Sequence, residues 1–84
     1  VFSLLEKPEN SNLKPQKAMA YSMQGIIDRR SGDYVGSIEN YTKSKTLYEE
    51  LNDSINTSSV IHNIGVVHRF MKNYQKNMVL RNLL

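Results

Sequence analysis

The chain has 84 residues, of which 39% are hydrophobic and 23% charged, with a net charge of +3 and no cysteine. This length and composition describe one small, ordered globular domain, and they exclude a disordered, collagen-like or two-domain chain. The lack of cysteine excludes a disulfide framework and a thiolate metal site, and no apolar run approaches the roughly 20 residues that span a bilayer. The amino end carries no recognisable secretion signal, so we expect a cytoplasmic protein.

Residues 1–15 are expected to be an N-terminal segment or the end of a preceding element. An apolar patch at residues 1–5 is followed by a polar stretch with Pro8 and Pro15, which is typical of a loop. Because the chain begins with Val1 rather than Met and ends within a helical pattern, we expect it to be a piece of a longer protein.

A first helix is predicted from residues 15–17 to about Arg30. Proline suits the first turn of a helix, where its missing N–H removes no hydrogen bond. The last turn contains Arg29 and Arg30, which complement the helix dipole, and Gly32 can supply a left-handed stop. Apolar residues recur at helical spacing; they are Ala18, Ala20, Met23, Ile26 and Ile27.

A second helix is predicted after Asp33, which can cap it. Tyr34, Tyr41 and Tyr48 are spaced seven residues apart and therefore share one helix face. Such a stripe is either a stacking platform for bases or peptides or a core seam between helices. We interpret it as a core seam.

A third helix, capped by Asn56, Thr57 or Ser58, is predicted to reach about Met71. Its apolar residues occupy two faces, which indicates packing on both sides. One face holds Val60, Ile64, Val67 and Met71, and the other holds Ile61, Gly65 and His68. We expect a tight turn at residues 72–73 and a fourth helix that carries Tyr74, Met78 and Val79.

One skeleton occurs twice, forty residues apart. Gly25 corresponds to Gly65, the following Ile26–Ile27 to Val66–Val67, and Tyr34 to Tyr74. Glycine within a helix costs about 1 kcal/mol relative to alanine, and a close helix crossing would explain its presence. At Gly25 we expect Tyr34 or Tyr41 to press against the bare backbone, and at Gly65 we expect a leucine substitution to impair folding. Repeated helical hairpins of this kind stack into solenoids.

These residues resemble a pair of tetratricopeptide repeats (TPRs) of the longer type, with a period of about 40 residues rather than 34. The resemblance covers about residues 17–80. It implies an all-α fold in which antiparallel helix-turn-helix repeats stack as a short right-handed α-solenoid of about four helices. The first hairpin would span residues 16–54, and the second, truncated one residues 55–84. Gln24, Asp28 and Asn77 depart most from the family pattern, and Lys72 replaces the turn glycine.

No catalytic or metal site is expected. His62 and His68 are six residues apart, so on a helix they point in different directions and cannot share a zinc ion. The sequence contains no recognisable catalytic triad and no glycine-rich phosphate-binding loop. We therefore expect a protein that is not an enzyme and needs no cofactor.

The resemblance implies a scaffold module that binds a partner peptide or helix in a concave groove. Its candidate partner-binding residues are Met19, Ser22, Ile26, Arg29 and Arg30 in the first hairpin, and Ser59, His62, Val66, Arg69 and Phe70 in the second. Two alternatives are an RNA-binding helical-repeat segment, which the small net charge disfavours, and a regulatory or sensor part of a larger signalling enzyme.

The charge and the apolar end of the chain bear on the partner. Residues 54–84 contain basic residues and no acidic one. This field favours an acidic partner, although a solvated helix face is the simpler interpretation. The last helix would leave apolar side chains without a neighbour, so we also expect self-association through it; they are Met78, Val79, Leu80, Leu83 and Leu84.

Overall fold

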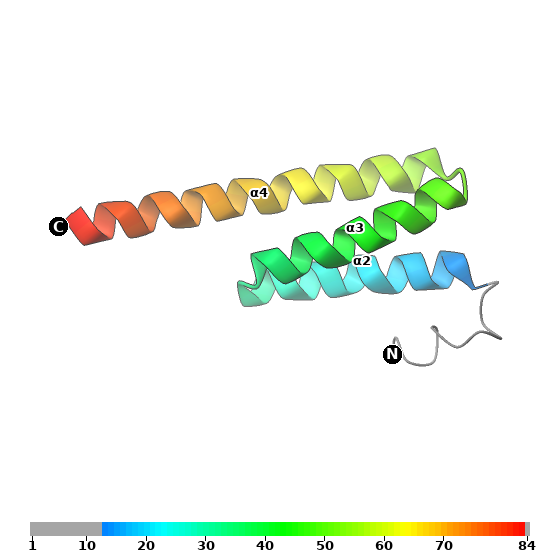
Figure 1. The fold of residues 1–84 in the computed structure, drawn as a ribbon, viewed down its shortest axis with the longest axis horizontal. Coiled ribbons are helices and arrows are strands. Elements are labelled where there is room, and N and C mark those ends of the chain that lie inside the picture. The colour runs from blue at the N-terminus through cyan, green and yellow to red at the C-terminus, as the bar shows by residue number, and fades with distance from the viewer. Residues whose placement is uncertain (1–12, 84) are drawn as a thin grey trace.

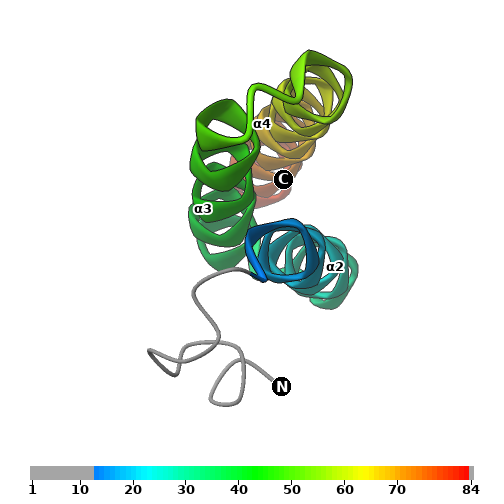
Figure 2. The ribbon, with the colours of Figure 1, turned by 90° about the vertical axis from the view of Figure 1, so that its right-hand side faces the viewer.

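The computed structural model describes residues 13–83, which form three helices: α2 (Lys14–Ser31), α3 (Tyr34–Glu50) and α4 (Ser54–Leu83). Each helix runs antiparallel to the next, and α4 continues well past the end of α3 (Figure 1). Viewed end-on, α3 lies between the other two, which diverge from it to form a crescent (Figure 2). The expected all-α class is confirmed for this part of the chain. Residues 1–12, including the apolar patch, lie outside the described range.

The turn between α2 and α3 is built as its sequence predicts. Gly32 adopts the left-handed conformation at φ 89°, and its N–H donates to the carbonyl of Arg29. A side chain at this φ would be strained, which explains the glycine. The Asp33 carboxylate then accepts the N–H of Gly36 at 2.9 Å and caps α3.

The two helices meet in a close crossing at Gly25. A Cβ atom at this position would lie 2.9 Å from ring carbons of Tyr41, so only glycine lets the ring approach. Two buried serines of α3 fasten the same contact: Ser37 donates to the Gly25 carbonyl at 2.6 Å, and Ser44 donates to the Ala18 carbonyl at 2.7 Å. Of the two tyrosines expected against Gly25, Tyr41 is therefore the one that makes the contact.

The tyrosine stripe forms the core seam that the sequence predicts. Tyr41 and Tyr48 are buried, and Tyr34 is partly buried against the same cluster. Val60 and Val67 of α4 complete the cluster. Burial of these apolar and aromatic groups is the main force that holds α4 on the hairpin.

The predicted cap of the next helix is wrong by a few residues. The chain reverses at Asn52, whose φ of 56° is left-handed, a conformation that asparagine tolerates better than most residues. Helix α4 begins at Ser54, and the Asp53 carboxylate accepts the backbone N–H of Asn56 at 3.1 Å. Asp53 therefore caps the helix in place of Asn56, Thr57 or Ser58.

The turn expected at residues 72–73 is absent, because both residues lie inside α4. In the first copy, Gly32 supplies the left-handed residue that stops the helix. Lys72 stands at the equivalent position, and its side chain disfavours that conformation. The helix therefore continues, residues 13–83 form three helices instead of four, and no second hairpin is closed within them.

The second predicted close crossing is also wrong. Nothing lies within 4 Å of a Cβ built at Gly65. Ile61 and His68, which share its face, are exposed, so α4 packs against α3 on one face and not on two. The predicted loss of stability in Gly65→Leu is therefore not expected within the described residues, since the side chain would block no helix crossing there.

The distal part of α4 extends beyond its neighbours (Figure 1). Met78, Val79 and Leu80 are 44–58% exposed, as expected for an unpartnered end. The side chains of Leu83 and Leu84 lie outside the described residues. No helix in the described range is long and apolar enough to cross a membrane.

The two repeat glycines should respond oppositely to alanine. At Gly25 the added methyl group meets the ring of buried Tyr41, and such overpacking typically costs about 1–3 kcal/mol. At Gly65 the methyl group enters open space and removes a glycine penalty of about 1 kcal/mol. Urea unfolding followed by circular dichroism should therefore show Gly25→Ala destabilised and Gly65→Ala stabilised. Equal shifts of the same sign would contradict the two assignments.

Candidate partner-binding groove

A hollow of about 390 Å³ opens between α2 and α4 over the middle of α3. Its lining comes from all three helices and consists of Ile26, Arg29, Arg30, Tyr41, Asn63, Val66 and Phe70. A second hollow of about 250 Å³ shares Val66 and Phe70 and adds Arg69 and Asn73. We call these nine residues together the concave groove.

The structure brings six of the ten candidate residues into this groove. They are Ile26, Arg29, Arg30, Val66, Arg69 and Phe70. Met19 and Ser22 on α2, and Ser59 and His62 on α4, do not line either hollow. The Ser22 hydroxyl lies 2.6 Å from that of Ser44, so it serves the contact between α2 and α3.

Three groove residues were missed from the sequence. The tyrosine spacing places Tyr41 in the core, and the structure shows that Tyr41 also lines the groove. Asn63 and Asn73 lie on the same face of α4 as Val66 and Phe70, at intervals of three or four residues. That spacing is the signal that would have identified both asparagines.

Arg29 connects all three helices at the groove. Its guanidinium carbon lies 5.4 Å from the ring centroid of Phe70, a cation–π contact between α2 and α4. Arg29 also acts on Tyr41 of α3, where its positive charge opposes the rise that burial causes in the pKa of the tyrosine. Phe70 in turn stacks on Tyr34, with centroids 6.4 Å apart and ring planes 9° apart. These contacts hold Arg29 and Phe70 in fixed positions.

The groove is positively charged. Its lining contains three arginines and neither aspartate nor glutamate. The ion pairs within residues 13–83 are Lys14–Glu50 and Lys45–Glu49, and neither involves the groove. The cationic ends of Arg30 and Arg69 are therefore left for a ligand, whereas Arg29 lies over the ring of Phe70.

Two of the departures from the repeat pattern form a polar cluster. The Asp28 carboxylate accepts hydrogen bonds from Gln24 at 2.9 Å and from Asn40 of α3 at 2.7 Å. The bond from Asn40 ties α2 to α3. The cluster satisfies Asp28 outside the groove lining, so this carboxylate does not compete for the groove arginines.

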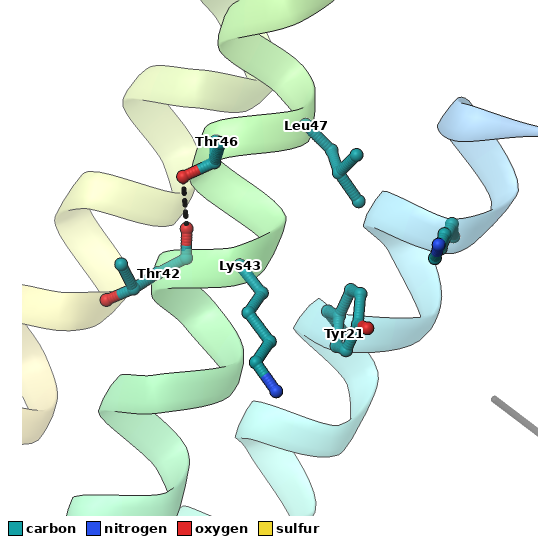
Figure 3. Close-up of a pocket in the computed structure, with 6 residues that line it drawn as sticks. Tyr21, Thr42, Lys43, Thr46 and Leu47 are labelled. Carbon is teal, nitrogen blue, oxygen red and sulfur yellow. Dashed lines mark hydrogen bonds between the residues drawn. The ribbon is translucent and has the colours of Figure 1, made fainter. Parts of the chain in front are cut away.

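A different hollow, of about 290 Å³, follows the seam of α2 and α3 and includes no residue of α4 (Figure 3). Lys43 reaches over the ring of Tyr21, with 5.4 Å between its Nζ and the ring centroid. The Thr46 hydroxyl donates to the Thr42 carbonyl at 3.1 Å. Since these groups already have partners, the seam offers fewer free groups to a ligand than the concave groove does.

No protein-family model, curated protein or solved structure matches this chain. Within the described residues, no three histidine, aspartate or glutamate side chains are grouped so that they could hold a metal ion. The function is therefore argued from the groove itself.

The buried tyrosines make folding sensitive to alkali. Burial raises the pKa of Tyr41 above its ordinary 10.0, although Arg29 and Arg30 partly oppose this, and burial and Asp53 raise the pKa of Tyr48. Because both folded-state pKa values lie above those of the unfolded chain, the stabilisation is complete below about pH 10 and is lost as the pH rises through the folded values.

We expect a Tyr41→Phe/Tyr48→Phe variant to unfold at higher pH than the wild type in alkaline titrations followed by circular dichroism. Tyr74→Phe, which changes an exposed ring, is the control and should leave the midpoint unchanged. If the double variant unfolds at the wild-type pH, the burial of these hydroxyls does not govern alkaline stability.

Proposed function

We propose that the chain is a non-catalytic protein-interaction module of the TPR kind, which holds a segment of a partner protein in the concave groove. The groove itself carries the proposal. Three helices converge on one positively charged hollow, and the residues that a TPR-like arrangement assigns to partner binding make up most of its lining.

The lining has the chemistry of a peptide-binding surface. Ile26 and Val66 are half-buried, and Phe70 is 42% exposed. An apolar side chain of a partner can therefore be buried against these three residues. Aromatic and arginine residues dominate the energetics of protein interfaces, and Phe70 is already fixed by Arg29 and Tyr34. A surface ordered before binding loses less entropy on association.

The charges favour an acidic segment. Arg30 comes from α2 and Arg69 from α4, so a segment lying between the two helices meets a guanidinium on each side. Guanidinium groups pair with carboxylates through two parallel hydrogen bonds. The partner that fits is an extended or helical segment with an apolar anchor flanked by aspartate or glutamate.

In this proposal α2 and α3 form one repeat, and the proximal half of α4 is the first helix of the next. Two observations support it: α4 runs antiparallel to α3, and Val60 and Val67 bury against the same cluster as the tyrosine seam. The solenoid arrangement then explains why α2 and α4 face each other across the floor made by α3 (Figure 2).

The test is a peptide selected from a displayed random library against the 84-residue chain, with its affinity measured by fluorescence anisotropy. We expect selected peptides to contain acidic residues and to bind about tenfold or more weakly to Arg69→Glu, since breaking a charge-assisted contact costs 1.5 kcal/mol or more. Arg81→Glu changes an exposed arginine of the same helix outside the groove and should bind normally.

Two results would overturn this function. One is equal binding by Arg69→Glu and the wild type, which would place the partner elsewhere. The other is salt-dependent binding of single-stranded RNA with a defined sequence preference, abolished by Arg69→Glu, which would make the groove a nucleic-acid site.

A further inference from the structure

One end of the concave groove gathers hydrogen-bond donors from all three helices. Arg29 and Arg30 of α2, Tyr41 of α3 and Asn63 of α4 line the same hollow of about 390 Å³. We call these four residues the arginine pocket. Within residues 13–83, no carboxylate pairs with either arginine, and the side-chain amide of Asn63 makes no hydrogen bond. The pocket therefore presents cationic and polar donors without an acceptor to match them.

The two arginine charges act on the same point of the pocket. Burial raises the pKa of the Tyr41 hydroxyl, and the positive charges of Arg29 and Arg30 both oppose that rise. Electrostatic interactions weaken with distance, and both arginines line the hollow beside Tyr41. Two like charges held close together are unfavourable in the free protein. An anion with more than one negative charge would remove this cost.

Arg29 can bind an anion while it stays over Phe70. The contact, at 5.4 Å from the ring centroid, uses the face of the guanidinium group. The N–H donors lie in the plane of that group, so its edges stay open to a ligand. Phe70 is itself stacked on Tyr34. Arg29 is therefore oriented before an anion arrives, which lowers the entropy lost on binding.

We propose that the arginine pocket binds the phosphate group of a phosphorylated side chain in the partner segment. This inference rests on the proposed function, in which the groove holds that segment. A phosphomonoester carries nearly two negative charges at about pH 7 and three acceptor oxygens. It therefore matches two guanidinium groups and the amide of Asn63 together. A carboxylate has one charge and two oxygens, so it would leave one arginine uncompensated.

The rest of the groove then holds the flanking residues of the segment. Val66 and Phe70 line both hollows and provide the apolar contact, whereas Arg69 lines only the second hollow. The phosphate would lie at the α2 side, and an acidic side chain of the segment would lie near Arg69 on α4. Phosphorylation of the partner would therefore switch its binding on, because it supplies the charge that the pocket lacks.

The pocket fits a phosphomonoester better than the phosphodiester of a nucleic acid. A phosphodiester group carries one negative charge, whereas Arg29 and Arg30 converge on one hollow. Proteins that bind single strands also offer aromatic rings on which successive bases stack. The ring of Phe70 already contacts Arg29 and Tyr34, which leaves less of its face for a base.

The test starts from a peptide library with a fixed central phosphoserine and random flanking positions. The peptide that binds the 84-residue chain most tightly is then synthesised with phosphoserine, glutamate or serine at the centre. Affinities are measured by fluorescence anisotropy at constant ionic strength. We expect the phosphoserine form to bind about tenfold or more tightly than the glutamate form, since it gains charge-assisted hydrogen bonds. The side-chain amide signals of Asn63 should shift in NMR spectra with phosphoserine and not with serine.

Three variants locate the phosphate. Arg30→Gln should reduce the preference for phosphoserine over glutamate by about tenfold, and circular dichroism should show an unchanged fold, because Arg30 is exposed. Arg81→Gln removes the same charge from an exposed site outside the groove and should keep the preference. Arg69→Gln should weaken the phosphoserine and glutamate forms alike, since Arg69 lines the other hollow.

The outcomes separate this proposal from the function on which it rests. Equal affinity for the phosphoserine and glutamate forms, or a preference that survives Arg30→Gln, would overturn the phosphate site. If both forms still depend on Arg69, the peptide-binding function stands without it. If no form of the peptide binds, both proposals fail. An unstructured oligouridylate that displaces the phosphoserine peptide and binds more tightly would also overturn the proposal, because the pocket would then serve a nucleic acid.

Discussion

The contact between the ring of Tyr41 and the backbone of Gly25 is the constraint on which the other features depend. It sets the distance between α2 and α3, and that distance lets the Ser37 and Ser44 hydroxyls reach carbonyls of α2. Both hydroxyls are buried, so each would be costly without its partner. At the crossing, the packing of the Tyr41 ring and the hydrogen bonds of both serine hydroxyls therefore require the same distance between the helices. This shared requirement gives a hairpin of about 40 residues a unique geometry.

The same tyrosine connects the fold to the candidate site. Its ring packs on Gly25, and it lines the groove together with Arg29, whose charge opposes the rise that burial causes in its pKa. Arg29 then lies over Phe70, so the position of α4 relative to α2 is fixed through a side chain whose own position is fixed by the core. The shape of the groove is therefore a consequence of the hairpin contact and not an independent feature of its surface.

The sequence was most informative where the local chemistry has one solution. Gly32 followed by Asp33 predicted the turn, and the tyrosine spacing predicted the core seam, because left-handed backbone and helix faces leave few alternatives. The sequence was misleading at residues 72–73, where a turn was predicted by analogy with the first copy of the repeat. Lys72 has a side chain that disfavours the left-handed conformation with which Gly32 ends α2. The repeated sequence pattern is therefore present in the second copy, but the hairpin is not formed.

The groove was predictable only in part for a related reason. Repeat register identified the arginines, Ile26, Val66 and Phe70, since these depend on one helix face each. It could not identify Tyr41, whose role depends on how three helices converge, nor exclude Ser22, whose hydroxyl turns to Ser44. Pairings between helices are decided by tertiary contacts that a single-helix pattern does not encode.

Native-state hydrogen exchange tests the central claim, that stability is concentrated at the crossing of α2 and α3 and passes from there to the proximal half of α4. The account predicts that amides near Gly25, Tyr41 and Val67 exchange only through global unfolding. Amides of residues 75–81, whose side chains are exposed, should have protection factors lower by at least about 100-fold, since this part of the helix opens locally. Uniform protection along α4, or weaker protection near Gly25 than in the distal helix, would contradict it.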